Sequence, residues 1–372
     1  MRIAIVGCGQ LSRMMALAGL PIGLKFSFIH DDASQNLDCV EGLGIIERSP
    51  NPTKNADGTN SYDADAIAAL YVALGEPECI SVEKEQVDLA LMQALAKCCP
   101  IYPSVEAIEA CQHRGKEKQL LTDLAIPTSP YLYNASAIEA GQKLGYPAMA
   151  KSCTEGYDGK NQWVIKNDAD AQAFDKLAMT DYIIEAFVKF EKEISLVSAR
   201  SQSGEIVHYS LAENHHEQGM LTHSIAPALN IPAHLQQQAQ DYMESLLNNL
   251  EYVGILAIEF FVVGDALMVN ELAPRVHNSG HWTQLGSITC QFENHVRALA
   301  GLTLGSTEQI SMTGMFNLIG TAQPPLDALT ANSKLYWYNK EPKVKRKLGH
   351  INFIVENEQQ VREQIAQLAA RD

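Results

Sequence analysis

The sequence lacks a hydrophobic run long enough to cross a membrane. Its longest apolar tract, residues 253–263, is interrupted by Glu259 and followed by Gly264 and Asp265, whereas a membrane-spanning helix needs about 20 consecutive apolar residues. The apolar stretch of residues 2–7 is too short for a signal peptide. We therefore expect a soluble cytoplasmic protein with no membrane partner.

The eight cysteines lack the spacing of a disulfide framework or a zinc site. They are scattered along the chain, without a C-x-x-C pair and with mostly apolar neighbours. Disulfide-rich and zinc-binding chains show closer, more regular spacing. The pattern therefore predicts reduced thiols in the core of a cytosolic protein.

Positive charge is also scarce. The 28 lysines and arginines stand against 44 aspartates and glutamates, which gives a net charge of −16. Such a charge repels phosphate backbones at long range. General nucleic-acid binding is therefore excluded, and any anion that the protein binds needs a local basic site. The P-loop pattern G-x-x-x-x-G-K-[ST] is missing as well.

What the sequence does contain is enough chain for two or three domains, since 372 residues are available and a domain takes roughly 150. A strand at residues 2–7, a helical segment to Leu20 and a strand at 25–30 predict a βαβ start. Further strands are expected at 79–82 and 101–104, and further helical segments at 86–97 and 105–124. This alternation predicts a Rossmann-like parallel layer over residues 1–112, with a flexible surface loop of turn-forming residues at 49–60.

After residue 127 the pattern changes to short strands around single helices. Strands are expected at 148–153, 162–166 and 182–187, with a helix at 168–178. Antiparallel strands are then expected at 193–200, 205–213, 253–263 and 266–276, with a helix at 233–250 before the last two. An α+β region of this kind suits one packed sheet face. We assign the domain limits 1–112, 113–301 with a lid subdomain at 127–187, and 302–372.

The segment GCGQLS, residues 7–12, partly matches the dinucleotide fingerprint G-x-G-x-x-G. Ser12 stands at the third position, where glycine normally allows a helix to pack tightly against a strand. A plain strand-to-helix turn explains the segment better than a nicotinamide cofactor does.

The loop TEGYDGKNQ, residues 154–162, has the composition of a phosphate-binding loop. Gly156 and Gly159 allow backbone N–H groups to approach phosphate oxygens, and Lys160 supplies charge. A surface hairpin with two turn glycines is the alternative. Lys151 favours the phosphate site, because a lysine inside the apolar run AMAKSC needs an anionic partner.

Glu259 and Glu271 each lie in an apolar strand, where a carboxylate must be paired or metal-bound. Two such carboxylates on neighbouring strands suggest Mg²⁺, and buried salt bridges to Lys or Arg are the alternative. A tight turn at Gly264-Asp265 would set Glu259 opposite Asn270. The two glutamates therefore share a face only if the hairpin contains a three-residue loop or a bulge.

Two polar segments complete the candidates. Residues 273–284, APRVHNSGHWTQ, follow the second carboxylate strand, and Arg275 in this segment is suited to gripping an oxyanion. Residues 340–347 form a basic segment in an acidic chain, preceded by the aromatic residues 336–338. A solvated charged strand and a site for a phosphate-bearing ligand are equally good explanations of it.

Taken together, GCGQLSRM, EGYDGKNQ, EISLVSAR, AIEFFV, NELAPRVHNSGHWTQ and the WYNK…KLGH tail resemble the 5-(carboxyamino)imidazole ribonucleotide synthetase family of ATP-grasp enzymes. The resemblance spans nearly the whole chain. It implies a Rossmann-like N-terminal (pre-ATP-grasp) domain, an ATP-grasp domain with a lid, and a small C-terminal domain. It also implies ATP and Mg²⁺ as cofactors and a homodimer without nucleic-acid partners.

The resemblance implies a role for each matching residue. For ATP, the implied residues are Arg114, Lys151, Gly156, Tyr157, Asp158, Gly159, Lys160, Asn161, Gln162, Glu185, Ala186, Phe187, Val188, Glu193, His216, Asn270 and Glu271. Glu259 and Glu271 are implied as the Mg²⁺ ligands, and Arg275 and Lys151 as catalytic residues. For the ribonucleotide, the implied residues are Glu83, Tyr157, Asp158, Arg275, Lys340, Arg346 and Lys347.

The implied reaction uses ATP and bicarbonate to carboxylate 5-aminoimidazole ribonucleotide through carboxyphosphate, in purine biosynthesis. Three positions depart from the family pattern, because Ser12, Glu155 and Asn161 replace glycines. We therefore expect activity with altered lid flexibility and phosphate contacts. The alternatives are an ATP-grasp ligase for another carboxylate and amine, a non-catalytic nucleotide-binding protein, and a nicotinamide dehydrogenase supported only by GCGQLS.

Overall fold

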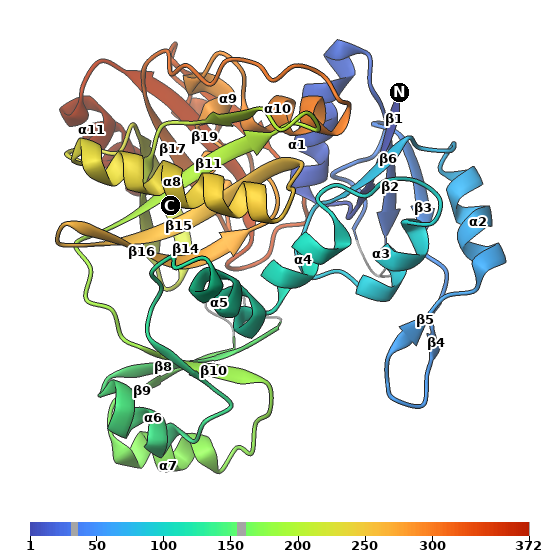
Figure 1. Ribbon diagram of the computed structural model, residues 1–372. Helices are drawn as coiled ribbons and strands as arrows, with labels where there is room; N and C mark the ends of the chain where they lie inside the picture. Colours follow the sequence, from blue (N-terminus) through green and yellow to red (C-terminus); the bar gives the residue numbers. More distant parts are fainter. Residues whose placement is uncertain (31–35, 155–160, 372) are drawn as a thin grey trace.

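The N-terminal part of the chain is built on a parallel sheet with the strand order β3-β2-β1-β6. The computed structural model describes residues 1–30, 36–154 and 161–371. The strands of this sheet are β1 (Arg2–Val6), β2 (Lys25–His30), β3 (Ile45–Arg48) and β6 (Cys79–Val82). Its helices are α1 (Gln10–Gly19), α2 (Ala64–Ala73), α3 (Leu89–Leu95) and α4 (Val105–Gln112), with the short η1 (Leu20–Ile22) after α1. The expected βαβ start and parallel layer are confirmed (Figure 1).

Burial on both faces explains the continuous apolar run of β1. Ile3 and Ile5 belong to a core shared with α1 and with α10 (Gln291–Leu299), a helix from much later in the sequence. Ala4 and Val6 point the other way, into a core formed with α2, α3 and α4. Alternate residues of one strand therefore connect two separate cores, as expected of a parallel sheet covered on both sides.

Three local expectations in this region are corrected. Residues 49–60, expected to be a flexible loop, carry a small hairpin of β4 (Thr53–Lys54) with β5 (Asn60–Ser61) that projects from the sheet (Figure 1). The strand expected at 101–104 is reduced to one bridge, between Ile101 and Ile80. The amphipathic stretch 105–124 is two helices, α4 and α5 (Arg114–Asp123), because His113 between them is extended, with φ −119° and ψ 112°.

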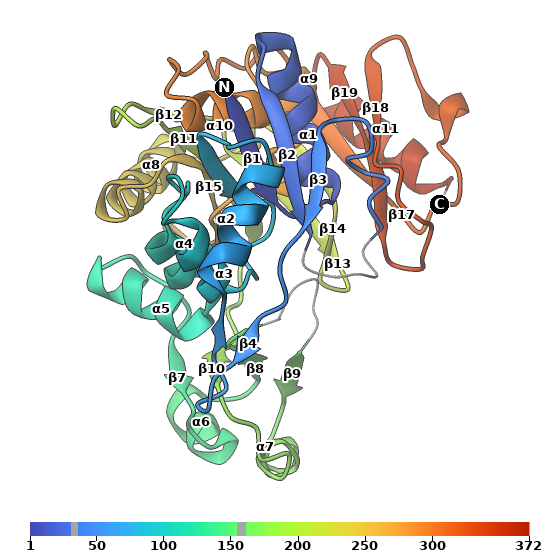
Figure 2. The ribbon, with the colours of Figure 1, turned by 90° about the vertical axis from the view of Figure 1, so that its right-hand side faces the viewer.

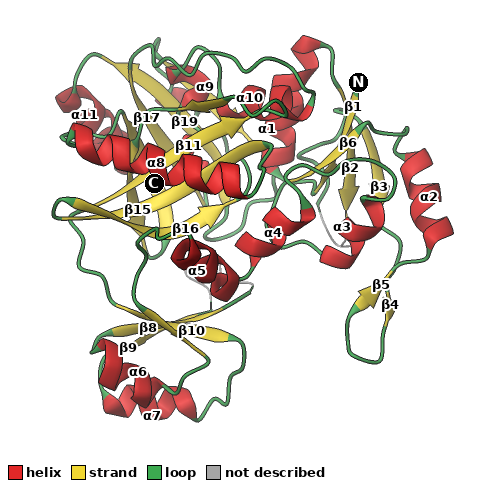
Figure 3. Ribbon diagram, in the orientation of Figure 1, coloured by secondary structure: helices red, strands yellow, loops and turns green. Residues whose placement is uncertain are grey.

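The lid unit is a separate antiparallel sheet with the order β7-β10-β8-β9. Its elements are β7 (Tyr131–Tyr133), α6 (Ala137–Leu144), β8 (Ala148–Ser152), β9 (Gln162–Ile165), α7 (Asp168–Asp175) and β10 (Tyr182–Ala186). Both helices cover the face turned away from the rest of the molecule (Figure 3), and their N-termini are capped by the side chains of Ser136 and Asn167. The expected α+β unit is confirmed.

A large sheet forms the body, with the order β16-β15-β11-β13-β14-β17-β19-β18. Its strands are β11 (Lys192–Arg200), β13 (Ala212–Glu217), β14 (Met220–Ala226), β15 (Gly254–Val263), β16 (Ala266–Ala273), β17 (Met312–Ile319), β18 (Ser333–Trp337) and β19 (Lys347–Val355). The strand expected at 205–213 is divided into β12 (Ile206–His208), which pairs with β11, and β13. Because β14 pairs with β17, the sheet runs on without a break into the C-terminal strands (Figure 2).

The remaining helices pack against the large sheet. They are α8 (Ala233–Asn249), η2 (Asn278–Gly280), α9 (Thr283–Gly286), η3 (Leu326–Ala328) and α11 (Glu358–Ala369), in addition to α10. On β15, Leu256, Ile258 and Phe260 pack in the core under α8, whereas Ile255 and Ala257 pack on the opposite face with α10. Among the residues that the structure describes, no helix has the length and apolar character to span a membrane.

Candidate active site

Glu259 and Glu271 face each other across the β15–β16 hairpin. The turn pairs Val263 with Ala266, and this register holds as far as Phe260 and Val269. A bulge then shifts the pairing by one residue, so that Glu259 pairs with Glu271. Of the two arrangements that would let the glutamates share a face, a three-residue loop or a bulge, the structure has the bulge, and it places the two carboxylates on one face.

The packing of β16 shows the same switch of faces. Leu267 and Val269 point into the core under α8, so strict alternation would send residue 271 there too. After the bulge Leu272 takes that direction instead, which leaves Glu271 on the opposite face with Glu259. The sequence pattern and the packing therefore agree on where the bulge lies.

The chemistry of this pair fits a divalent cation. Oxygen or nitrogen atoms of Glu259, Glu271 and His277 all lie within 4.8 Å of one another. Burial, followed by the charge of Glu271, raises the pKa of Glu259 to about 7. Two close carboxylates without a compensating cation resist ionisation, and a hard cation with oxygen ligands relieves this cost.

The imidazole of His277 lies beside the two carboxylates and is uncharged. Its Nε2 lies 3.9 Å from Oε1 of Glu259, while its Nδ1 is hydrogen-bonded to the hydroxyl of Ser279 at 2.9 Å. Burial and the charge of Arg275 hold the pKa of His277 well below its usual value. The imidazole is therefore uncharged and adds no repulsion toward a cation.

Lys151 has the anionic partner that its apolar strand required. Its Nζ donates to Oε2 of Glu185 at 2.6 Å, and Oε1 of the same carboxylate lies 3.2 Å from Nζ of Lys118. Burial by itself would raise the pKa of Glu185, but the two lysines lower it to about 2. Lys118 is 1% exposed and was missed by sequence reasoning, in which it is only one polar residue of an amphipathic stretch.

Arg114 holds the end of β8, from which the predicted phosphate loop departs. Its Nη1 donates to the carbonyl of Ser152 at 2.9 Å and its backbone N–H to the carbonyl of Cys153 at 2.9 Å. His113 beside it is hydrogen-bonded to Asp181, 2.8 Å between Nε2 and Oδ1, at the entry to β10. The start of α5 is thereby tied to both central strands of the lid.

Part of the predicted loop lies outside the described residues. These positions are Glu155, Gly156, Tyr157, Asp158, Gly159 and Lys160. Gln162 opens β9 and pairs with Lys151 across the sheet. Asn161 has a φ of 53°, a left-handed conformation that asparagine adopts more readily than other residues with a side chain. Asparagine therefore preserves the backbone that a glycine would provide there.

The residues expected around the base and ribose of ATP follow the lid. Ala186 and Val188 are half-buried, and Phe187 is exposed. Glu193 on β11 is hydrogen-bonded to Nδ1 of His216 on β13. Burial opposes protonation of His216, but the bond to Glu193 and the charge of Glu259 raise its pKa above the usual value. The charges of Glu259 and Glu271 both contribute to raising the pKa of His216, so His216 interacts electrostatically with the carboxylate pair.

Arg275 is committed to an acidic partner that sequence reasoning did not identify. Its Nε donates to Glu85, and its Nη1 donates to the carbonyl of Val276 at 3.1 Å. Burial would raise the pKa of Glu85, but Arg275 lowers it to about 2. The pair joins the segment after β6 to the segment after β16, and the remaining nitrogen Nη2 gives the guanidinium further donor capacity.

Glu83 occupies the N-terminus of α1. Its carboxylate accepts the backbone N–H of Gly9 at 2.6 Å and that of Leu11 at 3.1 Å. A Cβ added to Gly9 would lie 2.3 Å from Glu83 Oε1, so the glycine is needed for this close approach. The donors that a dinucleotide pyrophosphate uses in a Rossmann fold are therefore filled. Ser12 is buried and donates to the carbonyl of Gly7 at 2.9 Å.

Electrostatic interactions connect the basic segment, residues 340–347, to Glu83, Glu259 and His277. Burial lowers the pKa of Lys340, as do the charges of Arg346 and Lys347, while Glu83 opposes the shift. The positive charge of Lys347 contributes to lowering the pKa of Glu259 and that of His277. Nη1 of Arg346 donates to the carbonyl of Glu341 at 3.0 Å.

The aromatic residues before the basic segment are mostly structural. Tyr338 is 1% exposed and its hydroxyl is bonded to Nδ1 of His350 at 2.6 Å. Tyr336 stacks on the same imidazole, with 4.6 Å between ring centroids. They therefore pack the C-terminal sheet.

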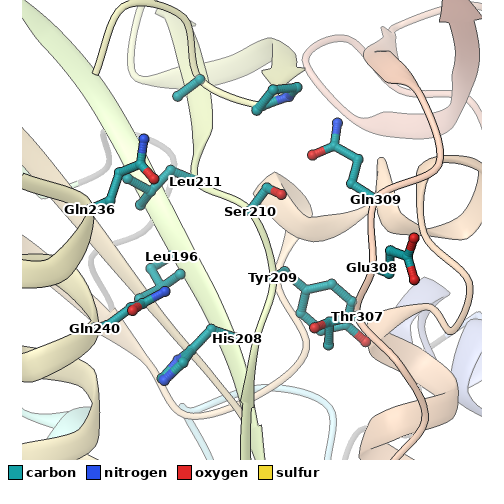
Figure 4. Close-up of a pocket in the computed structure, with 12 residues that line it drawn as sticks. Leu196, His208, Tyr209, Ser210, Leu211, Gln236, Gln240, Thr307, Glu308 and Gln309 are labelled. Carbon is teal, nitrogen blue, oxygen red and sulfur yellow. The ribbon is translucent and has the colours of Figure 1, made fainter. Parts of the chain in front are cut away.

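A separate hollow of about 310 Å³ lies between α8, the connection from β12 to β13, and residues 307–309 (Figure 4). His208 on its wall is already bonded to Ser198 at 2.8 Å and to Glu244 at 3.3 Å. Its lining includes none of the predicted site residues. The hollow is therefore separate from the candidate site around Glu259 and Glu271.

Three known protein families match successive parts of this chain. Family models match at residues 1–112 (ribonucleotide synthetase preATP-grasp domain), 119–292 (ATP-grasp domain) and 313–364 (phosphoribosylaminoimidazole carboxylase C-terminal domain). The N5-carboxyaminoimidazole ribonucleotide synthase of Vibrio cholerae is 38% identical, over 99% of this chain and 95% of its own. The chain belongs to the N5-carboxyaminoimidazole ribonucleotide synthase family.

Solved structures of the family have the same fold. The N5-carboxyaminoimidazole ribonucleotide synthetase from Thermus thermophilus superposes with a TM-score of 0.87 at 36% identity, covering 99% of this chain and 98% of that one. The Staphylococcus aureus N5-carboxyaminoimidazole synthetase complexed with ADP gives 0.86 at 28% identity, covering 98% and 96%. The expected arrangement of a pre-ATP-grasp domain, an ATP-grasp domain and a C-terminal domain is confirmed.

Proposed function

We propose that this protein uses ATP and bicarbonate to carboxylate 5-aminoimidazole ribonucleotide to 5-(carboxyamino)imidazole ribonucleotide, in purine biosynthesis. Family membership supports the reaction. The observation that carries it is the bulge that sets Glu271 opposite Glu259, because phosphoryl transfer needs a cation clamp of this kind. Asn270 beside Glu271 is linked through Lys118 and Glu185 to Lys151.

In this proposal ATP lies between the lid and the large sheet. Arg114 and Lys151 bind its phosphates, together with residues 156–162 of the loop. Glu185 to Val188 line the adenine pocket, Glu193 takes the ribose hydroxyls, and His216 and Asn270 lie near the nucleotide. The Staphylococcus aureus relative complexed with ADP supports nucleotide binding by this fold.

Glu259 and Glu271 are the proposed holders of Mg²⁺. Burial and the charge of Glu271 raise the pKa of Glu259 to about 7, and this supports the assignment because a bound cation would offset the repulsion. A bound magnesium ion would neutralise the charge that develops on the transferred phosphoryl group. The lysine and arginine side chains act on the same charge from the protein's side.

The chemistry has to overcome the poor electrophilicity of bicarbonate. A bicarbonate oxygen attacks the γ-phosphorus of ATP and ADP leaves, which gives carboxyphosphate. Carboxyphosphate then releases phosphate and CO₂, and the exocyclic amine of the ribonucleotide attacks CO₂ and loses a proton. Lys151 and Arg275 stabilise the negative charge during transfer, and closure of the site keeps water from the intermediate.

The ribonucleotide is proposed to lie where the N-terminal layer meets the basic segment. Lys340, Arg346 and Lys347 would bind its 5′-phosphate, while Glu83 and Arg275, with Tyr157 and Asp158 of the loop, would contact the remainder. The electrostatic link of Lys340 to Glu83 supports this position. This position would bring the exocyclic amine of the ribonucleotide toward Glu259 and Glu271. Lys347 interacts electrostatically with Glu259, in line with this placement.

Three further features belong to the proposal. We propose that the domains divide at 1–112, 113–301, with the lid at 127–187, and 302–372. We also propose a homodimer, for which the exposed Leu17, Leu20 and Ile22 of α1 and η1 offer an apolar contact surface, and a cytoplasmic location. Light scattering of the purified protein checks the dimer.

The decisive experiment measures ADP release with and without each co-substrate. ADP formation that requires both bicarbonate and the aminoimidazole ribonucleotide supports the proposal. Formation that requires bicarbonate but another amine indicates a different ATP-grasp ligase. ADP formation unaffected by both compounds contradicts the proposed reaction.

A further inference from the structure

Two adjacent charged residues of α5 are almost completely buried. Glu117 is 3% exposed and Lys118 is 1% exposed. The sequence pattern indicates no role for either of them. Both side chains contact the backbone of β16, and they do so on either side of Glu271.

The two contacts use opposite polarities. Oε2 of Glu117 accepts the backbone N–H of Leu272 at 3.1 Å. Nζ of Lys118 donates to the backbone carbonyl of Asn270 at 3.1 Å. One acceptor and one donor on α5 therefore bracket the residue whose direction the bulge decides.

The bulge creates the need for these partners. In the register of the hairpin Phe260 pairs with Val269 and Glu259 with Glu271, which leaves Asn270 without an opposing residue. β16 also stands at one end of the sheet order, where Thr128 meets it through a bridge to Val269. Backbone groups at a bulge on an edge need acceptors and donors from outside the ladder when they are buried.

Lys118 joins this edge to the lid. Its Nζ has three donors, and three acceptors surround it: the Asn270 carbonyl, Oγ1 of Thr128 at 2.6 Å, and Oε1 of Glu185 at 3.2 Å. Thr128 in turn donates to the carbonyl of Val269 at 2.9 Å. The ammonium group is therefore fully used in holding backbone and carboxylate in place.

We propose that Glu117 and Lys118 are positioning residues that hold the bulged segment of β16, and thereby keep the carboxylate of Glu271 on the same face as that of Glu259. Without them the hairpin is free to relax into the register set by its turn. In that register residue 271 moves to the opposite face. The inference rests on the proposed function in so far as Glu271 is a metal ligand, but it does not depend on the carboxylation reaction.

The test measures metal binding without turnover. Mn²⁺ is titrated into the protein with saturating ADP, and free Mn²⁺ is followed by electron paramagnetic resonance. Glu117→Leu removes the acceptor for Leu272 N–H and is expected to raise the half-saturating Mn²⁺ concentration at least tenfold. Glu117→Gln retains an amide oxygen as acceptor and should stay within about twofold of the parent, since no charge at this position is required.

Two further variants make the result independent of one substitution. Lys118→Met is expected to weaken Mn²⁺ binding in the same way, whereas Lys116→Met on the exposed side of α5 should leave it unchanged. If Glu117→Leu and Lys118→Met fail to fold, Thr128→Val, which removes one acceptor of Lys118, is expected to weaken Mn²⁺ binding about threefold.

The outcomes separate this inference from the proposed function. Unchanged Mn²⁺ binding by a folded Glu117→Leu or Lys118→Met variant, or by Thr128→Val where it is the variant that folds, overturns the positioning role. Equal weakening by Glu117→Gln and Glu117→Leu overturns it too, because a lost charge rather than a lost acceptor would then be responsible. A parent protein that binds Mn²⁺ but fails to carboxylate the ribonucleotide contradicts the proposed reaction alone.

Discussion

Glu271 lies directly opposite Glu259, one position out of the register that the turn of their hairpin sets. The displacement has a chemical result, because it brings two carboxylates together on a face where one would otherwise stand alone. It also has an energetic result, since burial and mutual repulsion raise the pKa of Glu259 to about 7. A site with these properties is poised to take up a cation.

Glu271→Gln is therefore expected to abolish metal-dependent turnover while leaving the fold intact. A metal ion contributes several kcal/mol of charge stabilisation in phosphoryl transfer, so kcat should fall by at least about a hundredfold. The melting temperature of the metal-free variant should equal or exceed that of the parent, because one repulsive charge is gone. Asp265→Asn, in the exposed turn of the same hairpin, is the control. Turnover within a few-fold of the parent would contradict the metal assignment.

Lys340→Ala or Arg346→Ala is expected to raise the KM for the ribonucleotide and to leave the KM for ATP nearly unchanged. A charge-assisted phosphate contact is worth about 1.5 to 3 kcal/mol, which corresponds to roughly ten- to a hundredfold. Steady-state kinetics with each substrate varied in turn measures the effect. Lys343→Ala serves as the control, since Lys343 is exposed and pairs with Glu341. A parallel rise in both KM values would move the segment into the ATP site.

His295 and His350 are expected to make stability depend on pH below neutrality. Burial lowers the pKa of each to about 3 from an ordinary value of 6.5. The unfolded chain then binds more protons than the folded one between these values, so the free energy of unfolding falls as the pH drops below about 6.5. The slope is at most roughly 1.4 kcal/mol per pH unit for each histidine.

The hydrogen bonds of His350 explain why it stays neutral. Nε2 is bonded to Oε1 of Gln284 at 2.9 Å and Nδ1 to the hydroxyl of Tyr338 at 2.6 Å. The amide oxygen can only accept, so Nε2 carries the proton and Nδ1 accepts from the tyrosine. Urea unfolding of the parent and of His350→Gln at pH 7, 6 and 5 should show a shallower pH slope in the variant. Equal slopes would show that His350 does not contribute.

Gly9→Ala is expected to destabilise the protein by about 1 to 3 kcal/mol, the range for overpacking a close contact. The added methyl group meets Oε1 of Glu83 and displaces the carboxylate from the N–H groups of Gly9 and Leu11. Urea unfolding measures the loss. In a Glu83→Ala background the same substitution should cost much less, because the obstructing carboxylate is absent. Additive effects of the two substitutions would contradict this interpretation.

The parts of the site that the sequence predicted are those in which one residue conflicts with its surroundings. Glu259 and Lys151 are charged residues in apolar strands, so the local sequence alone indicates that each requires a partner. The alternation of residues from the turn showed that Glu259 and Glu271 share a face only with a three-residue loop or a bulge, but it did not decide which of them is present. Local patterning also predicted the βαβ start and the lid unit, because their elements are adjacent in the sequence.

The missed residues depend on contacts between distant segments. The register of α5 against β16 is set by tertiary packing, so nothing near Lys118 indicates that it meets Asn270, 152 residues away. Glu85 and Arg275 are 190 residues apart, so the sequence around Arg275 indicated an anionic partner without identifying Glu85. The break at His113 was hidden because the apolar pattern continues through two consecutive helices.

The carboxylate of Glu83 at the N-terminus of α1 affects which other nucleotides could bind to the N-terminal layer. A cell contains abundant pyridine dinucleotides whose pyrophosphate suits a Rossmann turn. Here an intramolecular anion already holds the two N–H groups, and a tethered group competes at a high effective concentration. A free dinucleotide would have to expel that anion and meet its negative charge.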